Sequence, residues 1–197
     1  MKPDNAGLSA GAFLKNGGFS RLSGTGNTVL GDLAALLTYP RAGFRSLAEQ
    51  SMTRLRAAAP EAAAALEIFA GTVSQKSEAE LEELFTAAFD MNPAAALEIG
   101  WHLYGENYER GAFLVLMRGH MRRLGVREGR ELPDYLPNVL AALDRMEDCD
   151  ARGLAREKIL PALGKIRKAL AGSPYDGVLR AIELFLESGQ RRSEVAK

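Results

Sequence analysis

Hydrophobic residues recur every three or four positions along most of this chain, which is the spacing of amphipathic α-helices. The pattern begins at Val29 and continues to Leu186. Polar, glycine or proline residues divide it into nine stretches, which we expect to form helices. These stretches are 29–37, 44–55, 60–73, 81–89, 93–104, 107–124, 136–143, 154–170 and 174–186.

Residues with strong preferences for helix ends mark several of these boundaries. Ser77 and Glu80 form an S-x-x-E capping box, in which each side chain accepts from the other residue's backbone N–H. Asn92 is expected to cap a helix that Pro93 begins, and Gly125 suits a left-handed stop at a helix C-terminus. Pro161 either kinks its helix or starts a new one. Further expected boundaries lie at Pro40, Pro60, Asn107 and Ser173-Pro174.

Composition supports the same fold class. The chain of 197 residues contains 31 Ala and 28 Leu, but only 18 Val, Ile and Thr together. Ala and Leu favour helices, whereas β-branched residues favour strands. We therefore predict an all-α protein with a single compact multi-helix domain of about nine helices at residues 28–189. Residues 1–27 contain six of the 20 glycines and are expected to be a flexible tail, and residues 190–197 a short polar tail.

The charged and reactive residues exclude several function classes. The 25 basic and 25 acidic residues give zero net charge, which argues against general nucleic-acid binding. No apolar run approaches the roughly 20 residues that cross a bilayer, and the first residues make a poor secretory signal. The single cysteine, Cys149, excludes an internal disulfide framework and a multi-cysteine metal site. The simplest expectation is a reduced cytoplasmic protein without stable membrane insertion.

Isolated features that suggest chemistry do not assemble into a recognisable site. Gly26 and Gly31 are spaced as in a phosphate loop, but Asp32 follows them where such a loop needs lysine. A break near residues 105–107 separates His102 from His120, so no metal ligand set is expected. The segment 118–130 holds five Arg against one Glu; it either meets phosphate or an acidic partner, or is a solvated helix face. We expect no catalytic residue, metal or cofactor.

Three segments are more specific than generic helices. Residues 85–93 (FTAAFDMNP) end a helix with aromatics, followed by an acid and a proline. Residues 103–111 (LYGENYERG) place Arg110 near a helix start, where the helix dipole disfavours a cation, so we expect it to have a specific acidic partner. Residues 131–137 (ELPDYLP) carry two prolines, which stiffen the backbone ahead of the next helix.

The chain from about Val29 to Leu186 resembles the NarJ-type molybdoenzyme assembly chaperones, also called nitrate reductase delta subunits, of the TorD/DmsD group. The ELPDYLP segment is the most specific element of this resemblance. The elements that support it in the expected order are L-L-T-Y-P at 36–40, Phe89-Asp90, Y-G-x-x-x-x-R-G at 104–111 and S-P-Y at 173–175.

This resemblance implies a TorD-like fold and a dedicated cytoplasmic chaperone without catalysis of its own. Its partner would be the N-terminal segment of an apo molybdoenzyme catalytic subunit of the nitrate reductase alpha type. The chaperone would hold this segment until iron–sulfur and molybdenum cofactors are inserted, before membrane docking, and molybdenum-cofactor biosynthesis proteins are further candidate partners. Ala88 and Ala141 replace the Thr and Glu that are frequent in the family, which leaves the particular client open.

Candidate client-binding residues come from the three segments and from apolar residues near them. A helical client segment would place its apolar face in a groove between helices. The aromatic and methionine residues fit a core equally, and the acids could instead cap helices or pair with Arg110. An alternative function is a small helical nucleotide- or cofactor-binding protein that uses segment 118–130. The candidates are Phe89, Asp90, Leu97, Trp101, Tyr104, Arg110, Met117, Met121, Glu131, Leu132, Pro133, Asp134, Tyr135 and Pro137.

Overall fold

The computed structural model describes residues 28–194, with side chains described for residues 28–189. Helices dominate this part of the chain, and its only β-type pairing is an isolated bridge between Glu98 and Tyr135, so the all-α fold class is confirmed. The α-helices are α1 (Val29–Leu36), α2 (Phe44–Ala58), α3 (Pro60–Gln75), α4 (Glu78–Phe85), α5 (Ile99–Tyr104), α6 (Tyr108–Arg123), α7 (Leu136–Leu143), α8 (Asp148–Leu154), α9 (Leu160–Ala169) and α10 (Pro174–Glu194). The shorter helical turns are η1 (Thr86–Asp90, π), η2 (Pro93–Ala95, 3-10) and η3 (Ala155–Ile159, π).

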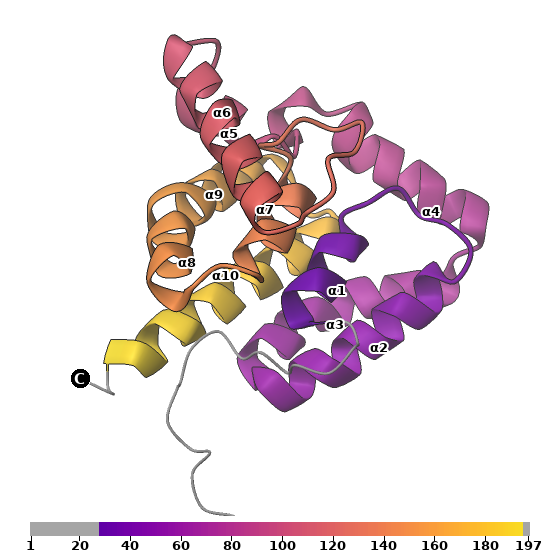
Figure 1. Cartoon of the computed structure of the whole chain (residues 1–197). Coiled ribbons are helices and arrows are strands. Elements are labelled where there is room, and N and C mark those ends of the chain that lie inside the picture. Colours follow the sequence, from indigo (N-terminus) through magenta and orange to yellow (C-terminus); the bar gives the residue numbers. More distant parts are fainter. Residues whose placement is uncertain (1–27, 195–197) are drawn as a thin grey trace, which may run out of the picture.

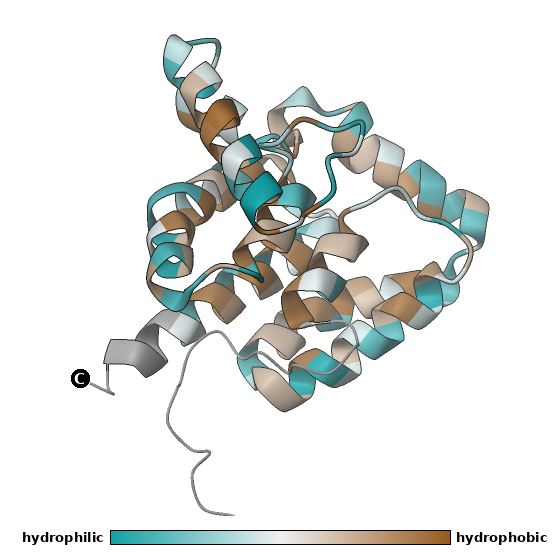
Figure 2. Cartoon of the chain, in the orientation of Figure 1, coloured by the Kyte–Doolittle hydropathy of each residue, from teal (hydrophilic) through white to brown (hydrophobic). Residues whose placement is uncertain are grey.

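The core lies where helices from both ends of the described chain meet. α10 packs along α3, α2 packs on α3, and α1 contacts both α2 and α7 (Figure 1). Apolar residues occupy the facing sides of these helices, whereas α2 and α4 present polar residues to solvent (Figure 2). Leu33, Leu66 and Val178 have no exposed surface. Each such burial stabilises the fold by about 1.5–3 kcal/mol, so the core depends on the apolar spacing seen in the sequence.

Several predicted helix ends are confirmed in detail. Glu80 N–H donates to Ser77 Oγ at 3.3 Å, and Ser77 N–H donates to Glu80 Oε2 at 2.8 Å, which completes the capping box. Gly125 adopts a φ of 64°, and the following Val126 N–H donates to Met121 O at 2.8 Å, as in a Schellman stop. Pro60 and Pro174 are the first residues of α3 and α10.

The predicted helix start at Asn92 and Pro93 is wrong. Pro93 begins only the short turn η2, and α5 starts six residues later, at Ile99. The Asn92 side chain makes no capping bond to η2; it donates instead to the carbonyl of Ala169, the last residue of α9, at 3.2 Å. Between η2 and α5 the chain is extended. There Leu97 O accepts from Leu136 N–H at 2.8 Å, so its hydrogen bond goes to a distant segment and not to a residue of the same helix. Asn107 does precede α6, although its side chain makes no capping bond.

The structure combines the two alternatives for Pro161, since this residue lies near the start of α9 and also follows a distortion within a continuing helix. Pro161 is the second residue of α9, which continues without interruption from η3 and α8. A proline lacks the N–H for a helical hydrogen bond, and the widened π turn of η3 ends two residues before Pro161. Because α8, η3 and α9 form one rod, the described chain contains about nine helical units, as predicted.

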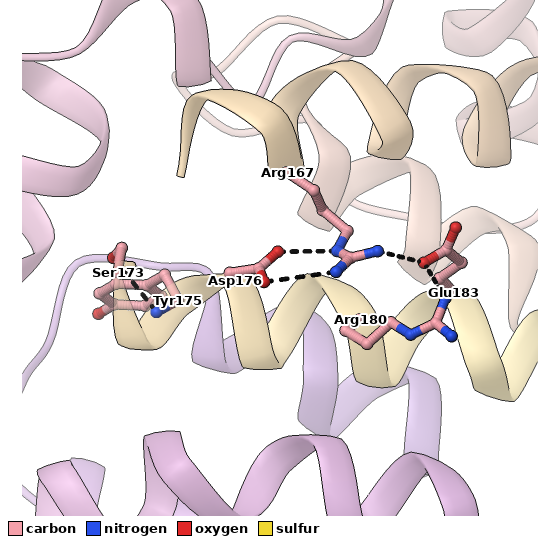
Figure 3. A network of polar contacts seen from close by, with 6 residues as sticks. All are labelled: Arg167, Ser173, Tyr175, Asp176, Arg180 and Glu183. Carbon is pink, nitrogen blue, oxygen red and sulfur yellow. Dashed lines mark hydrogen bonds and ion pairs between the residues drawn. The ribbon is translucent and has the colours of Figure 1, made fainter. Parts of the chain in front are cut away.

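A charged network joins α9 to α10 (Figure 3). Arg167 donates to Asp176 at 2.7 Å and to Glu183 at 2.7 Å, and Arg180 donates to Glu183 at 2.7 Å. Partial burial would lower the pKa of Arg167, but the hydrogen bonds and charges of Asp176 and Glu183 outweigh it and raise that pKa. The network therefore fixes the packing of the last two helices.

The predicted tails fall largely outside the described residues. This applies to residues 1–27 and to residues 195–197, while α10 continues to Glu194. Among the described helices, none combines the length and apolar character needed to cross a bilayer.

Candidate functional site

A pocket of about 720 Å³ opens between four segments that are distant in the sequence. These segments are the α1–α2 connection, the end of α4 with η1, the extended stretch before α5, and the loop before α7. The lining residues are Thr38, Tyr39, Arg41, Phe85, Phe89, Asp90, Ala96, Leu97, Glu98, Glu131 and Tyr135. Two of the three specific sequence segments, 85–93 and 131–137, thus meet at one place.

The floor of the pocket is aromatic. The Phe85 and Phe89 rings lie 5.0 Å apart, and the Tyr39 ring meets Phe85 edge-on at 5.6 Å. Tyr175 at the start of α10 is buried and contacts both phenylalanine rings, at 5.9 Å and 4.9 Å. Such packing holds the rings in fixed orientations. Phe85, Phe89 and Tyr175 are buried, and Tyr39, which is 44% exposed, offers aromatic surface to a ligand.

The rim of the pocket is acidic. We call Asp90, Glu98 and Glu131 the rim carboxylates, since all three line the pocket. Their carboxylates form no hydrogen bond or ion pair with any described residue, and Arg41 is the one cation among the lining residues. Burial raises the pKa of Tyr135, and the charges of Glu131, Glu98 and Asp90 raise it further. The pocket thus combines an apolar floor with excess negative charge.

Backbone pairing positions Glu98 of the rim and the lining residue Tyr135. Ile99 N–H donates to Asp134 O at 2.9 Å, and Leu136 N–H donates to Leu97 O at 2.8 Å. These bonds lie on either side of the bridge between Glu98 and Tyr135, so the extended stretch and the proline loop are held side by side. The Tyr135 hydroxyl also donates to Leu37 O at 3.1 Å, which ties the loop to the end of α1.

A buried ion pair supports the same loop. Arg110 Nε lies 3.2 Å from Asp134 Oδ2, and Asp134 is completely buried, which confirms the expected acidic partner for Arg110. The Arg110 guanidinium also lies over the Trp101 ring, 5.6 Å from its centre. A Cβ atom at Gly100 would lie only 2.6 Å from Asp134 Oδ2, so this close approach requires glycine.

The structure divides the predicted site residues into two sets. Five of them line the pocket: Phe89, Asp90, Leu97, Glu131 and Tyr135. The others do not line it. Met117, Met121, Pro133, Asp134 and Pro137 are buried, and Tyr104 and Arg110 are partly buried. Trp101 and Leu132 are exposed by 39% and 43%. The methionines therefore belong to the core beneath α6, the alternative that their helical spacing allowed.

Sequence reasoning missed several lining residues. Thr38 and Tyr39 were noted only as part of the L-L-T-Y-P element and not as binding residues. The sequence did not predict a binding role for Arg41, Phe85, Ala96 or Glu98 either. The available signal was the position of an aromatic and a proline directly after the first helix. Glu98 gave no local signal, since its position depends on pairing with residue 135.

No residue of the arginine-rich segment 118–130 lines the pocket, although Arg130 directly precedes the lining residue Glu131. Arg118 and Arg122 both donate to Glu128 at 3.0 Å, and Arg123 lies 3.8 Å from Asp150. Three of the five arginines of the segment are thus paired with carboxylates, and their side chains are 42–72% exposed, as in a solvated helix face. Within residues 28–194 there is no group of three or more His, Cys, Asp or Glu side chains that could hold a metal ion.

Comparison with known proteins identifies the family. The nitrate reductase delta subunit family matches residues 51–173. The chain belongs to this family. Curated relatives named nitrate reductase molybdenum cofactor assembly chaperone NarJ, from Escherichia coli strain K12 and from Escherichia coli O157:H7, are each 27% identical to it over 123 residues. The aligned region covers 60% of this chain and 52% of each relative, so the chain spans about half the length of the curated relatives it matches.

The delta subunit match confirms the resemblance inferred from the sequence. It includes η1, the extended stretch before α5 and the proline loop, and hence most of the pocket lining. The α1–α2 connection, which supplies Thr38, Tyr39 and Arg41, lies before the matched residues. Tyr175, which supports the aromatic floor, lies just beyond them.

Proposed function

We propose that this protein is an assembly chaperone that supports molybdenum cofactor insertion into a nitrate-reductase-type enzyme and has no catalysis of its own. The proposal is supported by membership of the delta subunit family and by the similarity to the Escherichia coli chaperones named for nitrate reductase molybdenum cofactor assembly. In this proposal the chaperone acts in the cytoplasm, on the apo catalytic subunit, before that subunit docks at the membrane.

The chaperone binds the N-terminal segment of the apo catalytic subunit in the pocket. The observation that carries this proposal is the joint presence of an aromatic floor and rim carboxylates that pair with no described residue. A segment that suits such a pocket inserts one or two large apolar side chains and places lysine or arginine beside them. Apolar burial then supplies affinity, and the opposite charges supply orientation and association rate.

Calorimetric titration of the full chain with synthetic N-terminal peptides of nitrate reductase catalytic subunits tests this proposal. We expect saturable binding to a peptide that contains both apolar and basic residues. Affinity should fall as salt concentration rises, because exposed charges are screened over about 10 Å at 0.1 M salt. Failure of every such peptide to bind would overturn the proposed client site.

Matched variants locate the binding site. Glu131→Gln and Glu98→Gln each remove one rim charge with little change of shape, and each should weaken peptide binding by about two- to fivefold, the value of an exposed ion pair. Glu49→Gln, on the exposed side of α2, is the control and should leave affinity unchanged. Equal losses in all three variants would show that the peptide responds to overall charge and not to the pocket.

The timing of the interaction has its own test. The chain should co-purify with a catalytic subunit produced without molybdenum cofactor, and not with the finished enzyme. Molybdenum-cofactor biosynthesis proteins should be recovered in the same complex. Equal recovery with the apo and the mature enzyme would instead indicate a permanent structural adaptor.

A further inference from the structure

The chain itself contains a segment that matches the pocket. Residues 12–22 read AFLKNGGFSRL, and they combine four large apolar residues with two cations and no acid. The pocket offers the complement, an aromatic floor and rim carboxylates that pair with no described residue. We propose that the 12–22 segment occupies the pocket of its own chain when no client is bound.

Charge favours this occupant. Lys15 and Arg21 are the cations of the segment, and each stands next to an apolar residue, Leu14 or Leu22. Three carboxylates against Arg41 leave the pocket lining with excess negative charge. Opposite charges orient a tethered segment and suppress occupants of the wrong sign.

Apolar content favours it as well. Phe13 and Phe19 are the large aromatic residues of the segment. An aromatic ring packed edge-on or offset against another contributes about 0.5–1.5 kcal/mol beyond the area it buries. Insertion of either ring would also cover the Tyr39 ring, which lines the pocket and is 44% exposed, whereas Phe85 and Phe89 are already buried.

The connection is long enough. Thr28 is fixed at the start of α1 by its hydrogen bond to Asp144, at 3.0 Å, while Thr38 and Tyr39 line the pocket just past the end of α1. The eight residues of α1 rise by about 12 Å. The six residues 22–27 can span up to about 20 Å when extended. Leu22 and the residues before it can therefore reach the pocket.

Tethering makes even a weak contact effective. A short linker gives an effective concentration of the order of millimolar, so a segment of modest affinity can fill an empty pocket. A client must then displace it, which lowers the client's apparent affinity in proportion to the fraction of open pockets. This regulatory consequence rests on the proposed function, whereas the contact within the chain does not.

Photo-crosslinking in the full chain tests the contact directly. Phe19 is replaced by p-benzoylphenylalanine, the protein is irradiated, and cross-linked peptides of the monomeric fraction are mapped by mass spectrometry. We expect cross-links to residues 38–41, 85–91, 96–98 or 131–135, with Met91, which is 76% exposed beside the rim, as a favourable acceptor. Cross-links confined to other parts of the chain, or found only between two chains, would overturn the proposal.

Charge variants of the cross-linking protein provide the control. Arg21→Glu should reduce the cross-link yield about threefold, since it turns an attraction into a repulsion. Lys2→Glu makes the same change of charge ten residues before the segment and should leave the yield unchanged. Equal losses in both variants, or no loss in Arg21→Glu, would contradict the proposed charge pairing.

The cross-linking experiment and the client titration test different claims, so each can contradict its own claim without affecting the other. If the cross-link forms but no catalytic-subunit peptide binds, the contact stands and the client function falls. If the peptides bind but no cross-link forms in the pocket, the client function stands and self-occupancy falls. If both hold, Arg21→Glu should bind the peptide about threefold more tightly than the unchanged chain, because fewer pockets are occupied.

Discussion

The α9–α10 network and the pocket rim are both charged, but they differ in how their charges are satisfied. Between α9 and α10, Arg167 spans two carboxylates, and Arg180 shares one of them (Figure 3). At the pocket, the rim carboxylates find no partner among the described residues. The first arrangement joins two helices, whereas the second leaves charge free for an external cation.

The difference indicates which charges stabilise the fold. A charge that loses water needs a partner to offset desolvation, whereas an exposed charge keeps its hydration and can remain unpaired. Arg110 and Asp134 show the first case directly beside the pocket residues, since Asp134 is completely buried. Paired charges that are at least partly buried should therefore affect stability, and the rim carboxylates should affect binding.

The largest effect is expected at the buried pair. Arg110→Met leaves the Asp134 carboxylate buried without its cation, and we expect the free energy of unfolding to fall by about 3 kcal/mol. Chemical denaturation measures this loss. Adding Asp134→Asn to the same variant removes the stranded charge and should restore a substantial part of the stability. A loss below about 0.5 kcal/mol would place this pair with the weak surface pairs.

A smaller effect is expected in the α9–α10 network. Arg167→Met removes the cation that joins Asp176 to Glu183, and should cost about 1–2 kcal/mol in denaturation experiments. Arg156→Met is the matched control, since Arg156 is 72% exposed and lies 3.7 Å from Glu157. The control should change stability by less than about 0.5 kcal/mol. Equal losses would remove the distinction between the network and an ordinary surface pair.

Tyr135 connects stability to the charge of the pocket. Its hydroxyl donates to Leu37 O, and Tyr135→Phe should cost about 1 kcal/mol near neutral pH. Burial and the rim carboxylates raise the pKa of Tyr135, so its contribution is complete below about pH 10 and declines as the pH rises towards the folded-state pKa. The difference in the free energy of unfolding between the unchanged chain and Tyr135→Phe should therefore be smaller at roughly pH 11 than at neutral pH. A constant difference across this range would mean that the Tyr135 pKa is not raised.

The smallest effect on stability is expected at the rim. Glu131→Gln and Glu98→Gln remove carboxylates that pair with no described residue, so each should change the free energy of unfolding by less than about 0.5 kcal/mol. Thermal and chemical denaturation on the proteins used for peptide titration supply the measurement. A loss of 1 kcal/mol or more, roughly, would assign these carboxylates a structural role and break the contrast with the network.

Local sequence signals predicted the helices well where the signals acted within one turn. The Ser77–Glu80 box and the Gly125 stop formed as expected, because their partners lie three to five residues away. The helix start predicted at Asn92 and Pro93 was wrong for the opposite reason. A distant strand-like pairing between Leu97 and Leu136 outweighed the local preference for a helix start.

The same distinction applies to the candidate site. Phe89, Asp90 and Glu131 were predicted from their segments and do line the pocket. Met117 and Met121 also have helical spacing, but they lie in the core. Helical spacing shows that two residues lie on the same face of a helix, but it does not show whether that face packs against the core or lines a pocket. Glu98 had no local signal at all.

The amino-acid sequence alone determined the all-α class, the positions of most helices and the family resemblance. These properties depend on periodicity, helix ends and short motifs, whose physical causes act between neighbours in the chain. Only the tertiary structure decided which carboxylates are paired and which face the pocket. Asp134 meets Arg110 across 24 positions, whereas Glu131, three residues earlier, meets no described cation. Pairing requires burial and contact in space, and a periodic pattern specifies neither partner.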